Sequence, residues 1–348
     1  MAKQNKDIMA LQLLKSAIRE KKPENLYIFF GDETFLMQHY LNQLHKILLD
    51  ELTESFNYHR FHNENFEVAA LAAAVENLPM MAEHTLIQVD DIDIFKLSED
   101  LRDKMTAILS DIPEYCTLIF TYETVAWKPD KRYKKYWELI QEKAQIVEFS
   151  KQEPRELIPW ITRHFAHKGK SISKELCGYL IDLTGGTMTA LAGEIEKISA
   201  YSGADHIVKA DIDAVTEPVL DAVVFQMTDL LGQGAYAPAL VKLQQLLKMQ
   251  QDPILILGAV GAHFRKISTA RVLMDRGRTA SELMKMYGMG NYPAQKTMDA
   301  ARKFSPAFCA KAMELILETD RRIKTSFDDP ERLLEVLVLR LAQEAQSG

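Results

Sequence analysis

Cysteine is scarce in this sequence of 348 residues, and the three that occur lie far apart. Cys116, Cys177 and Cys309 form no CxxC pair and have no histidine beside them at the spacing of a metal site. This excludes a disulfide framework, predicts no metal site, and is typical of a reducing compartment. Long apolar runs are also missing: stretches such as 255–260 are far shorter than the roughly 20 residues that span a bilayer. We therefore expect a cytoplasmic protein without membrane contact.

Positive charge is in short supply as well. The 42 lysines and arginines are outnumbered by 49 acidic residues, so the formal net charge is −7 and the pI is about 5.8. Such a surface does not attract nucleic acid over its whole area, and any DNA contact must be local or depend on partner proteins. Hydrophobic residues make up 47% and charged residues 26%, which is the balance of a folded protein, and the length indicates two or three domains.

The first 150 residues predict short strands separated by stretches long enough for a helix. Two of these strands are nearly continuous apolar runs, as expected for central parallel strands that are covered on both faces. The predicted strands are Leu26–Phe30, Asn57–Phe61, Thr85–Val89, Cys116–Tyr122 and Gln145–Phe149. Residues 1–150 are therefore expected to form an open α/β domain whose ligands sit at the carboxyl ends of the strands.

Beyond residue 150 the apolar residues recur at spacings of three and four, which predicts helices to the end of the chain. Glycines 169, 185 and 186 fall where helices end, and the Glu217-Pro218 step marks a second boundary. We expect a small helical domain at 151–217 and a larger all-α domain at 218–348. The predicted helices are 151–168, 173–183, 187–202, 210–216, 222–231, 235–249, 253–275, 280–286, 294–303, 306–326 and 330–343.

The phosphate-binding loop expected of such a chain is missing. An α/β domain followed by a small helical domain resembles the AAA+ ATPases, whose first strand leads into a glycine-rich loop with a lysine and a Ser or Thr. Here Leu26–Phe30 leads into Gly31, Asp32 and Glu33, and the two carboxylates would repel a triphosphate. Asp90 and Asp91 end the third strand like the Mg²⁺-holding acids of P-loop ATPases, although solvated acids at a strand end are the simpler interpretation. These five residues predict a degenerate nucleotide site without a cofactor.

Other catalytic motifs are absent too. The sequence contains no GxSxG, HExxH or GxGxxG, and His59 and His62 lack a carboxylate or cysteine at metal spacing. We therefore predict no catalytic residue and no catalysis by the chain itself.

Six separated segments carry a resemblance to a known family. They are residues 26–41, 75–91, 180–201, 227–267, 291–305 and 317–341. In this order they are similar to blocks of the delta subunits of bacterial DNA polymerase III clamp loaders, and together they span nearly the whole chain. The resemblance implies an AAA+ domain with a RecA-like parallel sheet, then a helical lid domain and an all-α collar domain.

The same resemblance implies a function within the DNA polymerase III holoenzyme. The chain would bind and open the ring-shaped sliding clamp (the beta subunit) for loading onto primed DNA. Its collar would pack with the other clamp-loader subunits, gamma/tau and delta-prime, in a hetero-oligomer, and DNA would be a partner of the whole assembly. A delta-prime identity is disfavoured because the chain lacks that protein's zinc-binding cysteines and SRC motif.

In that family an adjacent apolar pair at the tip of an early helix contacts the clamp. The matching residues here are Met80 and Met81, with Leu78 beside them. Methionine adapts to an irregular pocket, and Pro79 places the pair at a bend. Burial in the core is the alternative interpretation of such an apolar run.

The resemblance also implies DNA-contacting aromatic residues in the collar, and Tyr292 and Phe327 stand in predicted turns at corresponding places. A buried anchor of the loop is the alternative for each. Two other functions stay open on the sequence: an active AAA+ ATPase of another kind, and a non-enzymatic helical adaptor.

Overall fold

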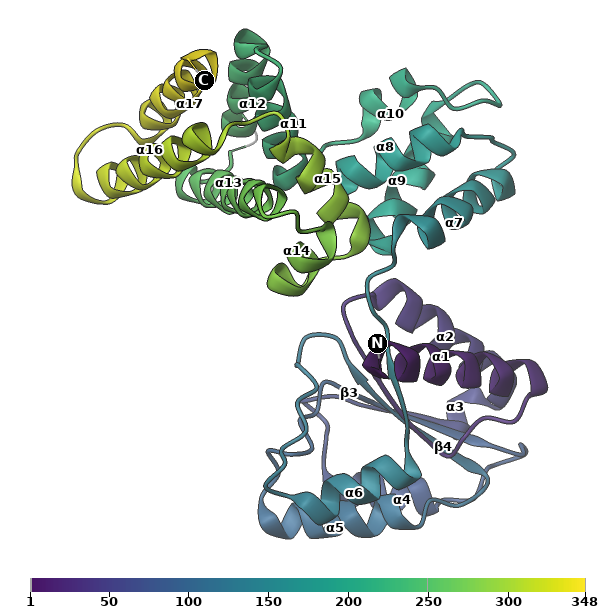
Figure 1. The fold of residues 1–348 in the computed structure, drawn as a ribbon. Coiled ribbons are helices and arrows are strands. Elements are labelled where there is room, and N and C mark those ends of the chain that lie inside the picture. The colour runs from purple at the N-terminus through teal and green to yellow at the C-terminus, as the bar shows by residue number, and fades with distance from the viewer. Residues whose placement is uncertain (1, 249, 348) are drawn as a thin grey trace. The chain divides into compact units, whose positions relative to one another are not determined.

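The chain folds into two compact units, described by a computed structural model that covers residues 2–248 and 250–347. Unit 1 comprises residues 1–151 and unit 2 comprises residues 152–348. Unit 1 is an α/β domain, and unit 2 is built from helices (Figure 1). Unit 2 contains both helical segments that the sequence separates at 217/218, and that second boundary stays a prediction.

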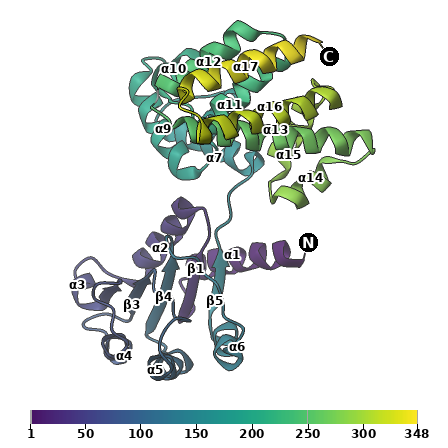
Figure 2. The same cartoon turned by 90° about the vertical axis from the view of Figure 1, so that its left-hand side faces the viewer.

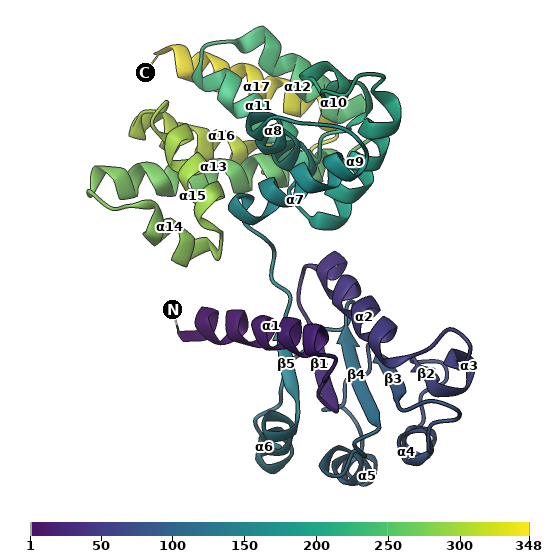
Figure 3. The same cartoon turned by 90° about the vertical axis from the view of Figure 1, so that its right-hand side faces the viewer.

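A five-stranded sheet with the order β2-β3-β4-β1-β5 forms the centre of unit 1 (Figure 3). All four neighbouring pairs are parallel. The strands are β1 Leu26–Phe30, β2 Tyr58–Phe61, β3 Thr85–Asp90, β4 Cys116–Tyr122 and β5 Gln145–Glu148. This strand order is that of RecA-like domains, so the predicted α/β class is confirmed. The carboxyl ends of all five strands meet at the same edge, where candidate ligand-binding residues belong.

Two helical layers cover the faces of this sheet, because successive side chains of a strand point to opposite faces. Leu26 and Ile28 of β1 pack in a cluster with helices α4 to α6, whereas Tyr27 and Phe29 pack with α1 and α2. Figure 2 shows α4, α5 and α6 along one side of the strands. The helices of unit 1 are α1 Ala2–Glu20, α2 Thr34–Leu48, α3 Glu54–Asn57, α4 Val68–Glu76, α5 Glu99–Ser110 and α6 Lys134–Lys143.

The helices of unit 2 form a first group, α7 to α10, and a second group, α11 to α17. In the first group α7 packs against α8 and α9, and in the second a continuous apolar core includes the stacked rings of Phe304 and Phe308. Helices α13 and α16 each begin with a proline, whose fixed φ angle suits the first turn of a helix. The side chains of Asp252 and Ser305 cap these two helices. The bounds are α7 Pro154–His167, α8 Lys174–Thr184, α9 Met188–Tyr201, α10 Lys209–Val215, α11 Leu220–Gly232, α12 Tyr236–Lys248, α13 Pro253–Asp275, α14 Ala280–Tyr287, α15 Asn291–Ala301, α16 Pro306–Thr325 and α17 Pro330–Ser347.

Within residues 2–248 and 250–347, no helix is both long enough and apolar enough to cross a membrane. The three cysteines are free thiols that lie buried in β4, α8 and α16.

One half-buried histidine in unit 2 has a strongly lowered pKa. The ring of His263 in α13 lies 5.6 Å from that of Phe225, and its Nε2 atom is buried with no hydrogen-bond partner among the described residues. Burial, together with the positive charge of Lys266, lowers the pKa of His263 from 6.5 to about 4. The folded protein therefore keeps this imidazole neutral where an unfolded chain would protonate it.

We predict a loss of stability on acidification that originates at His263. Below pH 6.5 the unfolded state binds a proton that the folded state excludes until pH about 4, so the free energy of unfolding falls as the pH falls through this window. The loss attributable to this residue is about 2 kcal/mol at pH 5. Denaturant unfolding at pH 7.5 and pH 5 should show this difference, and His263→Gln should reduce it. His167→Gln, at an exposed histidine in the same unit, should retain it in full.

Candidate functional site

The loop after β1 is hydrogen-bonded to the chain that follows β5. The backbone N–H of Glu33 donates to the carbonyl oxygen of Phe149 at 2.9 Å, and the N–H of Phe149 donates to that of Phe30 at 2.7 Å. A phosphate-binding loop needs its N–H groups free for the ligand, and the N–H of Glu33 is already used. Asp32 is exposed, but Glu33 is only 1% exposed. Only one of the two carboxylates predicted to repel a phosphate therefore faces solvent.

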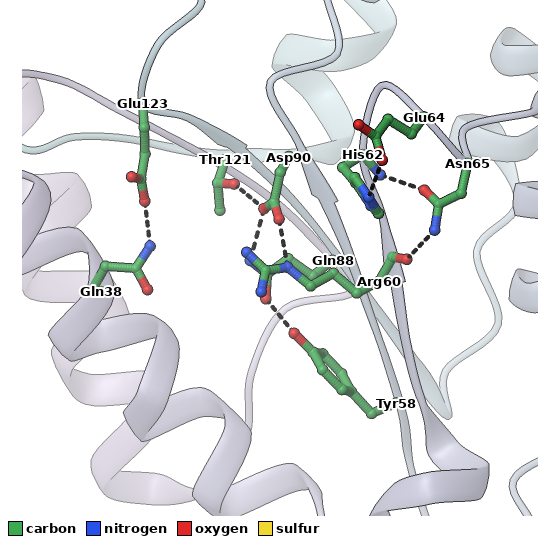
Figure 4. A network of polar contacts seen from close by, with 10 residues as sticks. All are labelled: Gln38, Tyr58, Arg60, His62, Glu64, Asn65, Gln88, Asp90, Thr121 and Glu123. Atoms are coloured by element: carbon green, nitrogen blue, oxygen red, sulfur yellow. Dashed lines mark hydrogen bonds and ion pairs between the residues drawn. The ribbon is translucent and has the colours of Figure 1, made fainter.

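Asp90, at the carboxyl end of β3, is the centre of a polar network (Figure 4). Its carboxylate accepts hydrogen bonds from Arg60 Nε at 2.6 Å, from Gln88 Nε2 at 2.7 Å, and from the Thr121 hydroxyl. Gln88 in turn accepts from the Tyr58 hydroxyl at 2.6 Å. The hydrogen bond to Asp90 raises the pKa of Arg60 above its usual value, so the guanidinium keeps its positive charge.

Asp91 is occupied by the loop that follows β4. Its carboxylate accepts from the backbone N–H groups of Glu123 at 2.8 Å and of Thr124 and Val125 at 3.0 Å, and from the Thr124 hydroxyl at 2.7 Å. Partial burial acts to raise the pKa of Asp91, but these hydrogen bonds outweigh it and lower the pKa below its usual value. Asp91 itself has a positive φ of 55°, a conformation that aspartate tolerates better than most residues.

Both acids at the end of β3 thus serve the protein's own structure. Asp90 pairs with Arg60 from β2, and Asp91 holds the loop at 123–125. No group of three or more His, Cys, Asp or Glu side chains in the described residues is placed to hold a metal ion. The arrangement favours the interpretation of Asp90 and Asp91 as structural acids.

The apolar run after α4 lies at the surface. The helix ends at Glu76, and the segment 77–84 is irregular up to the start of β3. Leu78 is 74% exposed, Met80 is 56% exposed and Met81 is 93% exposed. Burial in the core, the alternative interpretation of this run, is therefore wrong. Clustered exposed apolar side chains of this kind mark interaction sites in folded proteins.

One residue that the sequence did not indicate holds this segment. Asn57 closes α3 and is fully buried (0% exposed). Its Oδ1 atom accepts from the N–H of Met80 at 2.7 Å, and its Nδ2 atom donates to the carbonyl oxygen of Met80 at 2.9 Å. The two residues are 23 positions apart, and no sequence pattern connects them. The sequence placed Asn57 at the start of β2, whereas the strand begins at Tyr58 because Asn57 ends α3.

The two aromatic residues predicted near DNA have different surroundings in unit 2. Tyr292 lies in the first turn of α15, which corrects its predicted place in a turn between helices. It is half-buried, its hydroxyl lies 3.3 Å from an Asp182 carboxylate oxygen, and burial and this carboxylate raise the pKa of Tyr292 to about 12. Phe327 lies between α16 and α17 and is fully exposed. The alternative interpretation, a buried anchor of the loop, holds in part for the half-buried Tyr292. It is wrong for Phe327, which is fully exposed.

A RecA-like parallel sheet followed by helical segments is an AAA+-like fold. Comparison with known sequences identifies the family. The model of "DNA polymerase III, delta subunit" matches residues 27–150, and that of "DNA polymerase III delta subunit, C-terminal domain" matches residues 221–341. The chain belongs to the DNA polymerase III delta subunit family.

Individual relatives agree with this assignment. The chain is 23% identical to DNA polymerase III subunit delta of Bacillus subtilis over 350 residues, covering 98% of this chain and 99% of that protein. It is 27% identical to a probable DNA polymerase III subunit delta of Aquifex aeolicus, covering 56% of each chain. Among solved structures, the Bacillus subtilis DNA clamp loader delta protein has the same fold, with a TM-score of 0.62 at 20% identity, covering 95% of this chain and 98% of that one.

Proposed function

We propose that this chain binds the ring-shaped sliding clamp and opens it for loading onto primed DNA during chromosomal replication. The observation that carries the proposal is the bend at Leu78-Pro79-Met80-Met81, which exposes three large apolar side chains on a backbone held from within. Membership of the delta subunit family supports the choice of partner, because its relatives include a clamp loader delta protein.

The proposed contact is an insertion of Met80 and Met81 into an apolar pocket of one clamp protomer. Each side chain that passes from water into such a pocket contributes about 1.5–3 kcal/mol. Methionine has a flexible, polarisable side chain that fills irregular pockets. Binding energy gained on one protomer then favours the clamp conformation that fits the subunit, which is how a ligand shifts a conformational equilibrium without chemistry of its own.

The decisive experiment is a titration of the purified chain with purified clamp. A delta subunit binds the clamp directly, whereas a helical adaptor of another pathway does not. The other alternative, an active AAA+ ATPase, is disfavoured by the use of the Glu33 N–H by Phe149 and by the engagement of Asp90 and Asp91 within the fold. The ATP-dependent steps of loading are accordingly assigned to other subunits.

The partners within the assembly follow from the same proposal. The helical segment 218–348 acts as the collar that packs with gamma/tau and delta-prime, in the cytoplasm. Exposed apolar side chains on α16 and α17, such as Leu317 and Leu339, suit a surface that neighbouring subunits cover. Primed DNA is then a ligand of the whole complex and not of this acidic chain alone.

We predict that Phe327 contacts DNA in the assembled loader. Its exposed ring is free to stack on a base, and base–aromatic stacking contributes about 1–3 kcal/mol. Phe327→Ala should therefore weaken the affinity of the complete complex for primed DNA about 10-fold. Fluorescence anisotropy with labelled primer–template measures this. Tyr292→Phe, which removes only a hydroxyl directed at Asp182, should leave the affinity unchanged, and an equal loss in both variants would contradict the assignment.

A further inference from the structure

The segment 78–84, which carries the exposed methionines, makes few hydrogen bonds to the rest of unit 1. Residues 77–84 are irregular, and Met81 has a positive φ of 55°, a strained conformation for a residue other than glycine. Among the described residues, the hydrogen bonds found for 78–84 are the two between Met80 and the side chain of Asn57. The segment would otherwise be free to adopt many conformations.

Asn57 supplies a rigid support for these two bonds. Its Nδ2 atom donates to the carbonyl oxygen of Thr53 at 3.0 Å as well as to that of Met80, and its Oδ1 atom accepts from the Met80 N–H. The buried side-chain amide is thereby satisfied on both sides and cannot rotate without breaking a bond. Because both backbone groups of Met80 point toward Asn57, the side chains of Met80 and Met81 are left at the surface.

We propose that Asn57 is a positioning residue, which holds the segment 78–84 in its binding-competent conformation before the partner arrives. This inference rests on the proposed clamp-binding role of Met80 and Met81. A partner that meets an already ordered segment does not have to order it, and the avoided entropy cost appears as affinity. Asn57 itself is buried and does not touch the clamp.

The test compares Asn57→Ala with the matched control Asn25→Ala. Asn25 also uses its Nδ2 atom to hold two backbone carbonyls in unit 1, those of Pro113 and Cys116, each at 2.9 Å, but it does not touch the segment 78–84. We expect Asn57→Ala to bind the clamp about 10-fold more weakly, and Asn25→Ala to bind as the unmodified chain does. Asn57→Asp, which keeps an acceptor for the Met80 N–H but places an oxygen against two carbonyls, should also bind more weakly.

Hydrogen–deuterium exchange separates positioning from general destabilisation. In Asn57→Ala the backbone amide of Met80, which loses its hydrogen bond to Asn57, should exchange faster while the amides of β1, β3 and β4 remain protected, whereas a purely structural role would raise exchange throughout unit 1. Faster exchange across the whole unit, or clamp affinity equal to that of the unmodified chain, overturns the inference.

A second comparison distinguishes this inference from the proposed function. If the Met80→Ala, Met81→Ala variant loses clamp binding while Asn57→Ala retains it, only the positioning role of Asn57 fails. If the double methionine variant binds normally, the proposed function itself fails. In the Met80→Ala, Met81→Ala background, Asn57→Ala should cause no further loss, because there is no apolar pair left to position.

Discussion

Replacing Met80 and Met81 together by alanine is expected to weaken clamp binding by about 100-fold. The change removes most of two apolar side chains from the centre of the proposed contact, where a few residues carry most of the binding energy. Both side chains are exposed in the free protein, so their removal leaves the core intact. Calorimetric titration of the clamp with the purified chain gives the affinity, and a thermal unfolding curve confirms that the fold is retained.

A matched control for this variant exists elsewhere on the molecule. Met286, in α14, is an exposed methionine of unit 2, outside the proposed contact. Met286→Ala removes the same chemical group and should leave the affinity unchanged. An undiminished affinity of the Met80→Ala, Met81→Ala variant would end the proposal that this pair binds the clamp. Equal losses in both experiments would show a general effect of removing exposed methionine.

Gly31→Ala is expected to destabilise unit 1 by at least about 3 kcal/mol. A Cβ atom at this position would lie 2.4 Å from the carbonyl oxygen of Phe149 and 2.8 Å from its carbonyl carbon and nitrogen. These are backbone atoms of the chain leaving β5, which cannot move without breaking the hydrogen bonds of Phe149 to Phe30 and Glu33. The φ of 127° at Gly31 adds backbone strain for any other residue. Urea unfolding of the purified chain without nucleotide measures the loss.

Gly178→Ala provides the comparison for Gly31→Ala. Gly178 lies inside α8, where an added Cβ meets no atom within 4 Å. Alanine favours the helix over glycine by about 1 kcal/mol, so this variant should be as stable as the unmodified chain or more stable. If Gly31→Ala unfolded at the same urea concentration as the unmodified chain, the close approach of Phe149 would be wrong. A destabilisation in the absence of nucleotide assigns Gly31 a structural role that does not depend on phosphate binding.

The missing phosphate-loop motif predicts the degenerate site, but it does not explain why Gly31 is present. The sequence shows that the lysine and most of the glycines of a phosphate loop are absent, and this suffices to predict a degenerate site. It does not show why one glycine is needed. The reason is the backbone of Phe149, 118 positions further along the chain, which passes within contact distance of Gly31 and accepts the N–H of Glu33.

The start of α15 is a second feature that the sequence alone predicted incorrectly. The sequence predicts that the helix after Gly290 spans residues 294–303. In the structure α15 begins at Asn291 and includes Pro293 in its first turn, where the missing N–H of proline has no intrahelical partner to lose. Tyr292 is therefore helical and half-buried, and its hydroxyl faces Asp182 of α8.

The sequence by itself determined the order of an α/β unit and helical segments, the five strands to within one residue at each end, and the loss of the phosphate loop. These features depend on local patterns: apolar runs, helical spacing and the residues of one short loop. Only the tertiary structure decided that Met80 and Met81 are exposed, that Asn57 bonds to the backbone of Met80, and that the acids at the end of β3 are already engaged. The contacts behind these features join residues that lie 23 to 34 positions apart in the sequence. Such residues meet only when the sheet and its covering helices have packed.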